Sequence, residues 1–136
     1  MARRRLSQQQ KRRIKNAQSA VDLNDKNNCL GLVISHRGGV VEVEPLEKEN
    51  DNIQCKLRAN LGNIVCGDQV VYQQSEHDAT IIAIQPRSNL LQRQDGFGQV
   101  KSVAANITQL IICLSVEPEP NLYLLDQYLL SAEQQG

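Results

Sequence analysis

The chain has 136 residues, and its 15 Lys and Arg residues balance its 15 Asp and Glu residues, so the formal net charge is zero. This length holds one ordinary domain, or a small domain and part of another. Only 3% of the residues are aromatic, so any core must consist of Val, Ile and Leu. No stretch approaches the roughly 20 apolar residues of a membrane-spanning helix, and we expect no membrane partner.

The charge is unevenly distributed along the chain. Residues 1–20 carry seven cations and no acidic residue, whereas residues 21–136 carry eight cations against fifteen acidic residues, a net charge of −7. A block of like charge stays extended and is attracted to polyanions through counterion release. Nucleic acid is therefore the first partner to consider, the alternative being a solvated, disordered terminus without a partner. The seven cations are Arg3, Arg4, Arg5, Lys11, Arg12, Arg13 and Lys15.

Short β-like segments fill residues 30–85. An apolar run over 30–35, a turn at 36–39 and alternation around Val41 and Val43 predict a hairpin whose glycines need positive φ. Further strands are predicted over 53–58, 69–73 and 79–84. Five short strands without a helical period indicate an all-β barrel of OB or SH3 type, and the strand count favours the OB fold.

Three cations on this barrel are candidate RNA ligands. Arg37 lies in the first hairpin turn, and alternation places Lys56 and Arg58 opposite the apolar Ile53, Cys55 and Leu57. OB folds bind nucleic acid over this strand face and the adjacent loops. The alternative is that these cations only keep the barrel soluble. Since we expect Tyr72 to be a core residue, phosphates and RNA shape would be recognised more than bases.

The remaining segments are of another kind. Residues 86–105 contain Pro86, Gly96 and Gly98 and indicate an irregular linker, in which Arg87 and Arg93 are expected to serve docking. The apolar run 110–114 is typical of a strand buried on both faces of a parallel sheet. Asn121 is a suitable cap for a helix over 122–134, with Leu122, Leu125 and Leu129 along one stripe.

The four cysteines are widely spaced and form no close pair of the kind that zinc sites use. Cys55 and Cys113 fall inside strand-like apolar patterns. We expect buried, reduced thiols in a cytoplasmic protein, and neither a metal site nor a catalytic residue. His36 and His77 have no nucleophile or carboxylate at a suggestive spacing.

In their order, the motifs GLVISHRGG, CGDQVVY, PRSNLLQR, VAANITQLIICLSV and NLYLLDQYLLSAE resemble the circularly permuted GTPases that assist late assembly of the small ribosomal subunit in bacteria. The resemblance covers about residues 30–133. It implies a basic rRNA-binding extension over 1–29, an OB domain over 30–85, a linker over 86–105 and the first strand and helix of an α/β GTPase domain over 106–136. Asn106-Ile107-Thr108 and Asp126-Gln127-Tyr128-Leu129 depart from the usual Asn-Ile-Asp and Asp-Arg-Tyr-Leu.

The resemblance implies GTP, magnesium and a structural zinc for the full-length family member, with the small ribosomal subunit and its rRNA as partners and no DNA. The chain contains neither GxxxxGK[ST] nor Asn-Lys-x-Asp, so we expect no cofactor and no GTPase activity in this chain alone. We expect a monomer. The alternative function is a stand-alone OB or SH3-like nucleic-acid-binding or protein-interaction module with no enzymatic parent.

Overall fold

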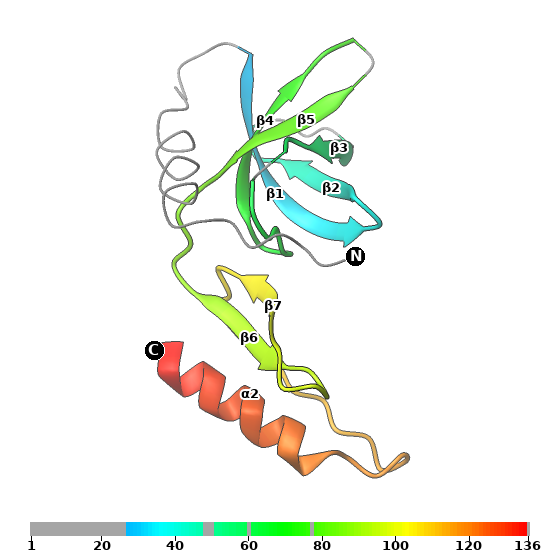
Figure 1. Cartoon of the computed structure of the whole chain (residues 1–136), viewed down its shortest axis with the longest axis vertical. Coiled ribbons are helices and arrows are strands. Elements are labelled where there is room, and N and C mark those ends of the chain that lie inside the picture. The colour runs from blue at the N-terminus through cyan, green and yellow to red at the C-terminus, as the bar shows by residue number, and fades with distance from the viewer. Residues whose placement is uncertain (1–26, 48–50, 60, 77, 136) are drawn as a thin grey trace.

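The structure is a computed structural model that describes residues 27–47, 51–59, 61–76 and 78–135. A β-barrel is followed by a separate two-stranded hairpin and one C-terminal helix, which lies beside the hairpin (Figure 1). The basic segment 1–20, with its seven candidate RNA ligands, lies outside the described residues. Within the described residues, no helix has the length and apolar character needed to cross a bilayer.

The barrel closes in the order β1-β2-β3-β5-β4, with β4 returning to β1. The pair β3 and β5 is parallel and all other pairs are antiparallel. This confirms the predicted five-stranded OB-type barrel. It begins at residue 28, inside the segment 1–29 that was assigned to the extension. The strands are β1 (Asn28–Arg37), β2 (Val40–Pro45), β3 (Ile53–Leu57), β4 (Gln69–Gln74) and β5 (Ala79–Ile84).

Alternation along β2 and β3 directs their core residues inward. In these strands the buried Val41, Val43 and Cys55 stand between more exposed residues, whereas in β4 three consecutive residues are buried. The φ angles of Gly38 (57°) and Gly39 (93°) are positive, as the tight β1–β2 turn was predicted to require. Tyr72 is 3% exposed and belongs to the core, as expected. The core cluster contains Val33, Val41, Val43, Cys55, Leu61, Ile64, Val70, Tyr72, Ala79 and Ile81.

The loop between β3 and β4 contributes more to the core than its sequence indicated. Asn60, Gly62 and Asn63 are typical loop residues, but Leu61, Ile64 and Val65 are all buried. Their spacing follows neither a helix nor a strand, so no periodic pattern reveals them.

The prediction that residues 86–105 form an irregular linker is wrong. Residues 90–105 form an antiparallel hairpin of β6 (Leu90–Gln94) and β7 (Val100–Ala105). The glycines interpreted as linker residues belong to its turn, where Gly98 has a φ of 72° and its N–H donates to the carbonyl of Asp95 at 2.9 Å. The Asp95 side chain also accepts from the N–H groups of Phe97 and Gln99.

The strand predicted over residues 110–114 is not formed, whereas the predicted helix is. No described strand pairs with this segment, and Ile111 is 76% exposed. The helix α2 (Leu122–Gln135) begins where expected, with the Asn121 side chain accepting from the N–H of Leu124 at 3.2 Å. Of the expected stripe, Leu122 and Leu129 are more than half exposed, and α2 instead packs its half-buried residues toward β6.

Candidate nucleic-acid interface

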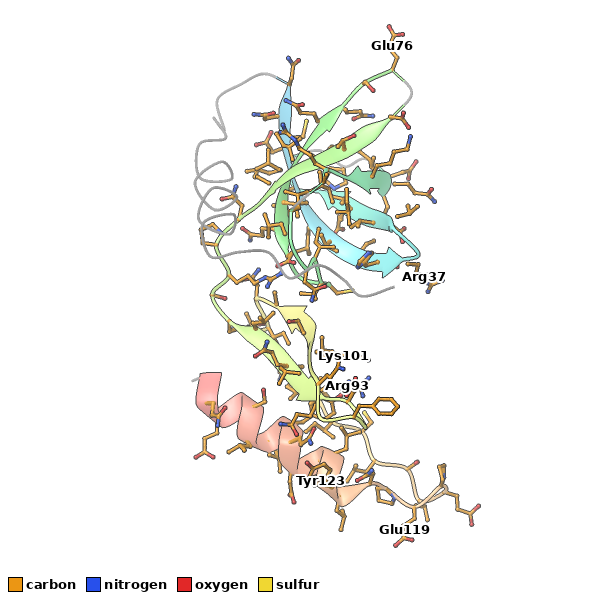
Figure 2. The ribbon with its side chains drawn as sticks, viewed as in Figure 1. Arg37, Glu76, Arg93, Lys101, Glu119 and Tyr123 are labelled. Carbon is orange, nitrogen blue, oxygen red and sulfur yellow. The ribbon has the colours of Figure 1, made fainter. Side chains whose placement is uncertain are left out.

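A row of side chains crosses the outer face of the barrel and carries two of the predicted RNA ligands. Arg37 pairs in register with Val40, and Val40 pairs with Lys56. Cross-strand partners point to the same face, and adjacent strands are about 4.8 Å apart, so the backbones of Arg37 and Lys56 lie roughly 10 Å apart with Val40 between them. Val40 is 44% exposed, which leaves the row open to solvent. Figure 2 shows Arg37 at the edge of the barrel, by the β1–β2 turn.

Arg58 extends this surface by one position. It follows β3 directly, its backbone N–H donates to the carbonyl of Ile81 at 3.1 Å, and its side chain is exposed. Lys56 is exposed within β3, and Arg58 is exposed directly after the end of this strand. We call Arg37, Lys56 and Arg58 the cationic face. Within the described residues, neither arginine forms an ion pair.

Lys56 differs from the two arginines because it already has a carboxylate partner. Its Nζ lies 2.7 Å from Oδ1 of Asp78, and both side chains are more than half exposed. Such an exposed ion pair contributes little stability and exchanges readily with other anions. Lys56 is therefore available to a phosphate, but only in competition with Asp78.

The hairpin carries a second group of exposed side chains, of which only Arg93 was assigned a role from the sequence. Arg93 pairs in register with Lys101, and Phe97 in the turn is 91% exposed. Figure 2 shows the two labelled cations on the hairpin, well away from Arg37. Lys101 contacts Asp95 at 3.0 Å, and this hydrogen bond holds the pKa of Asp95 below its ordinary value. The sequence feature that could have indicated this exposed group is Phe97, a single aromatic residue between two glycines.

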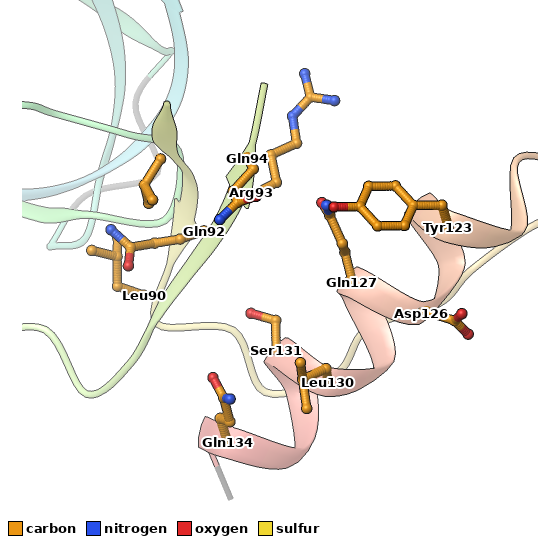
Figure 3. A pocket seen from close by; sticks show the side chains of 11 residues that line it. Leu90, Gln92, Arg93, Gln94, Tyr123, Asp126, Gln127, Leu130, Ser131 and Gln134 are labelled. Atoms are coloured by element: carbon orange, nitrogen blue, oxygen red, sulfur yellow. The ribbon is translucent and has the colours of Figure 1, made fainter. Parts of the chain in front are cut away.

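A hollow of about 470 Å³ lies between the hairpin and α2. Figure 3 shows Arg93, Tyr123 and Gln127 among the side chains that line it. The lining combines four glutamine amides with apolar and charged side chains and contains no arrangement of nucleophile and base. Oε1 of Gln127 is buried and has no hydrogen-bond partner in the described part of the chain. This hollow supports no catalytic assignment.

Arg87 has the structural role that was expected of it, and its partner is in the barrel. Its Nε and one terminal nitrogen donate to the two oxygens of the buried Asp68 at 2.6 and 2.8 Å, and the terminal nitrogen also donates to the carbonyl of Asn63 at 2.7 Å. Hydrogen bonding to Asp68 raises the pKa of Arg87 above its ordinary value. Arg93, by contrast, remains exposed.

The prediction of buried thiols holds for Cys55 and is wrong for Cys113. Cys55 is fully buried, and burial raises the pKa of its thiol to about 11. Cys113 is exposed because the strand expected around it is not formed. In the described ranges no three His, Cys, Asp or Glu side chains gather in a way that fits a metal ion. The described residues therefore offer no ligand set for the structural zinc that the family resemblance implies.

A closed OB-type barrel followed by a hairpin and a helix is the architecture of the described residues. The comparisons with known proteins show which family the chain resembles. The model of the RsgA GTPase family matches residues 84–136. Along 98% of its length the chain is 43% identical to a protein of Saccharophagus degradans named small ribosomal subunit biogenesis GTPase RsgA, of which it covers 42%. Its relative of the same name in Chromohalobacter salexigens is 38% identical over the whole chain, which covers 46% of that protein.

Solved structures agree with this relationship. The crystal structure of YjeQ from Thermotoga maritima superposes with a TM-score of 0.56 at 32% identity, covering 79% of this chain and 38% of that one. YloQ, described as a circularly permuted GTPase, gives a TM-score of 0.56 at 25% identity over 85% of this chain and 40% of that one. The family resemblance predicted from the motifs is confirmed. The chain spans less than half the length of the curated relatives it matches.

Proposed function

We propose that this chain is the RNA-binding portion of a GTPase that acts in late assembly of the small ribosomal subunit, in the cytoplasm. The barrel would bind rRNA through its cationic face, together with the seven cations of residues 1–20. The observation that carries this proposal is the row in which Arg37 and Lys56 flank Val40 on the outer surface of an OB-type barrel. The names of the relatives support the ribosomal context.

The chemistry of this surface favours phosphates over bases. Guanidinium and ammonium groups bind phosphate oxygens without reading base identity, whereas base stacking needs exposed aromatic rings. Tyr72, the aromatic residue of the barrel strands, is buried and its hydroxyl has a pKa raised to about 12 by burial. Affinity should therefore depend strongly on salt and weakly on base sequence.

A salt titration tests the contribution of the basic segment. Seven cations that engage phosphates give a slope of log affinity against log salt of about −5 to −6, taking about 0.7 to 0.9 per contact. We expect deletion of residues 1–20 to flatten this slope and to weaken binding to a small-subunit rRNA transcript by orders of magnitude. Equal binding by the intact and shortened proteins at every salt concentration would show that the segment takes no part.

The barrel is tested separately by the double variant Arg37→Ala/Arg58→Ala. We expect the slope to become shallower by about 1 to 2, because two phosphate contacts are lost. The charge-matched control is Arg93→Ala/Lys101→Ala, which removes two cations from the hairpin. If the control weakens binding as much as the barrel variant does, the cationic face is not the specific contact. If RNA binding shows no salt dependence, the chain is instead a protein-interaction module.

The GTPase activity is a proposal for the longer family member and not for this segment. The chain contains no phosphate-binding loop and no guanine-recognition motif, so no catalytic step can be derived from its residues. GTP, magnesium and the structural zinc are proposed to be bound by other parts of the full-length protein.

A further inference from the structure

The path of the chain from the barrel into the hairpin is fixed where it leaves β5. Arg87, three residues past the end of β5, is bound through two hydrogen bonds to Asp68, whose side chain is fully buried. Asp68 is held in turn by the N–H of Val65, which donates to its second oxygen at 2.9 Å. The connecting segment is therefore tied to the loop between β3 and β4 by a buried charged pair.

The chain segment that follows β7 is also bound to the loop between β3 and β4. The N–H of Ala105 donates to the carbonyl of Cys66 at 2.9 Å, and Nδ2 of Asn106 donates to the carbonyl of Gly67 at 2.8 Å. Gly67 has a φ of 84°, and a Cβ at this position would collide with the backbone of Ala105. The glycine permits this close approach of two backbones.

The two ends of the hairpin are also joined to each other. Oδ1 of Asn106 accepts from the N–H of Ser88 at 2.8 Å and from its hydroxyl at 3.1 Å. Asn89 and Ile107 form a reciprocal pair, in which each residue donates one hydrogen bond of 2.8 Å to the other. Asn106 has a φ of 54°, a left-handed conformation that asparagine tolerates better than most residues.

We propose that Asn106 is the positioning residue of a polar lock that makes the barrel and the β6–β7 hairpin one rigid body. The segment that enters the hairpin and the segment that leaves it are both bound to the loop between β3 and β4. Asn106, in the segment that leaves, contacts Gly67 of that loop and Ser88 of the segment that enters. Rotation of the hairpin on the barrel would have to break several hydrogen bonds together. The lock consists of Gly67, Asp68, Arg87, Ser88, Asn89 and Asn106.

This rigidity has a consequence for whatever follows the hairpin. The direction of the hairpin, and with it the position of α2 packed beside β6, is set by the orientation of the barrel. A ligand that binds the cationic face would then also orient the hairpin and the helix. The lock itself does not depend on RNA binding, and its test requires no RNA.

The experiment is residual dipolar coupling and amide hydrogen exchange on the 136-residue chain. We expect couplings from the barrel strands β1 to β5 and from the hairpin strands β6 and β7 of the unaltered protein to fit one alignment tensor. Asn106→Asp keeps the oxygen that accepts from Ser88 but replaces the Nδ2 donor, so it removes the bond to Gly67 and places a carboxylate against that carbonyl. We expect exchange at the Ala105 amide to become about tenfold faster and the two parts to require separate tensors.

A matched control makes the same chemical change outside the lock. Asn52→Asp removes an exposed hydrogen bond of 3.1 Å to Glu42 and should leave the single tensor and the Ala105 exchange rate unchanged. Asn106→Gly, which accepts the positive φ, should loosen the hairpin even if Asn106→Asp fails to fold. Two tensors in the unaltered protein, or unchanged Ala105 exchange in the folded Asn106 variants, would overturn the proposal.

Discussion

At the scale of single residues, burial decides what each ion pair does. Lys56 and Asp78 lie 2.7 Å apart on the surface, whereas Arg87 and Asp68 meet at 2.6 Å with the carboxylate fully buried. Solvent screens the first pair, and its side chains remain free for other partners. In the second pair each charge depends on the other, because a buried carboxylate without a cation is costly. The first pair therefore contributes little to stability, whereas the second belongs to the framework of the fold.

This difference predicts the outcome of removing each cation. Arg87→Met should lower the free energy of unfolding by about 3 to 5 kcal/mol, because it leaves a buried charge unpaired. Lys56→Met removes an exposed pair by the same kind of substitution and should cost less than about 1 kcal/mol. Urea denaturation followed by circular dichroism measures both. Similar losses for the two variants would contradict the structural role assigned to Asp68.

Burial of Cys55 predicts how stability depends on pH. Its thiol has a pKa of about 11, raised by burial from an ordinary value of 9.0. Between these values the unfolded chain releases the proton while the folded protein retains it. The stability contribution is complete below pH 9 and is lost as pH rises toward 11, by at most about 3 kcal/mol.

Denaturation at pH 8 and pH 10.5 checks this expectation. The loss of stability between the two pH values should be smaller in Cys55→Ala than in the unaltered protein. Tyr72, whose pKa is also raised, stays in both proteins and contributes equally to both. An identical loss in the two proteins would show that Cys55 does not govern the alkaline behaviour.

At the scale of elements, residue patterns in the sequence correctly predicted the strands and turns that depend on interactions between neighbouring residues. The strands around Val41 and Cys55 follow alternation, and the Gly38-Gly39 turn follows from backbone sterics. The local pattern of residues 110–114 could not show whether this segment forms a strand, because strand hydrogen bonds need a neighbouring strand and the described part of the chain supplies none. The hairpin over 90–105 was missed because its glycines were interpreted as linker residues when they form a turn.

Residues 110–114 form no strand, whereas the barrel strands are buried, and this difference predicts the effect of two matched substitutions. Ile111→Ala should change the free energy of unfolding by less than about 0.5 kcal/mol, because this side chain is 76% exposed. Ile81→Ala, inside the barrel on a fully buried side chain, should cost about 2 to 5 kcal/mol. Thermal or chemical denaturation distinguishes them. A large loss from Ile111→Ala would show that residues 110–114 pack as a strand after all.

At the scale of the whole molecule, the order of residues showed the uneven distribution of charge, but the positions of the cations in space had to come from the fold. Arg37 and Lys56 are 19 positions apart in sequence and become neighbours only through the register of three strands. Asn106 was part of a family motif, and nothing in its local sequence indicated that it contacts Gly67. Contacts of this kind depend on topology, which periodicity does not report.

Two nucleotide-binding motifs are missing from the sequence, and their absence predicts that this chain by itself does not bind or hydrolyse GTP. Nucleotide binding requires a loop of backbone N–H groups around the phosphates and a side-chain arrangement that reads guanine, and neither motif occurs in its sequence. We expect no saturable binding of a fluorescent GTP analogue and no phosphate release. A full-length relative, such as the protein of Saccharophagus degradans, is the positive control and should show both. Tight GTP binding by the 136-residue chain would mean that the barrel, hairpin or helix contains a nucleotide site that the family motifs do not describe.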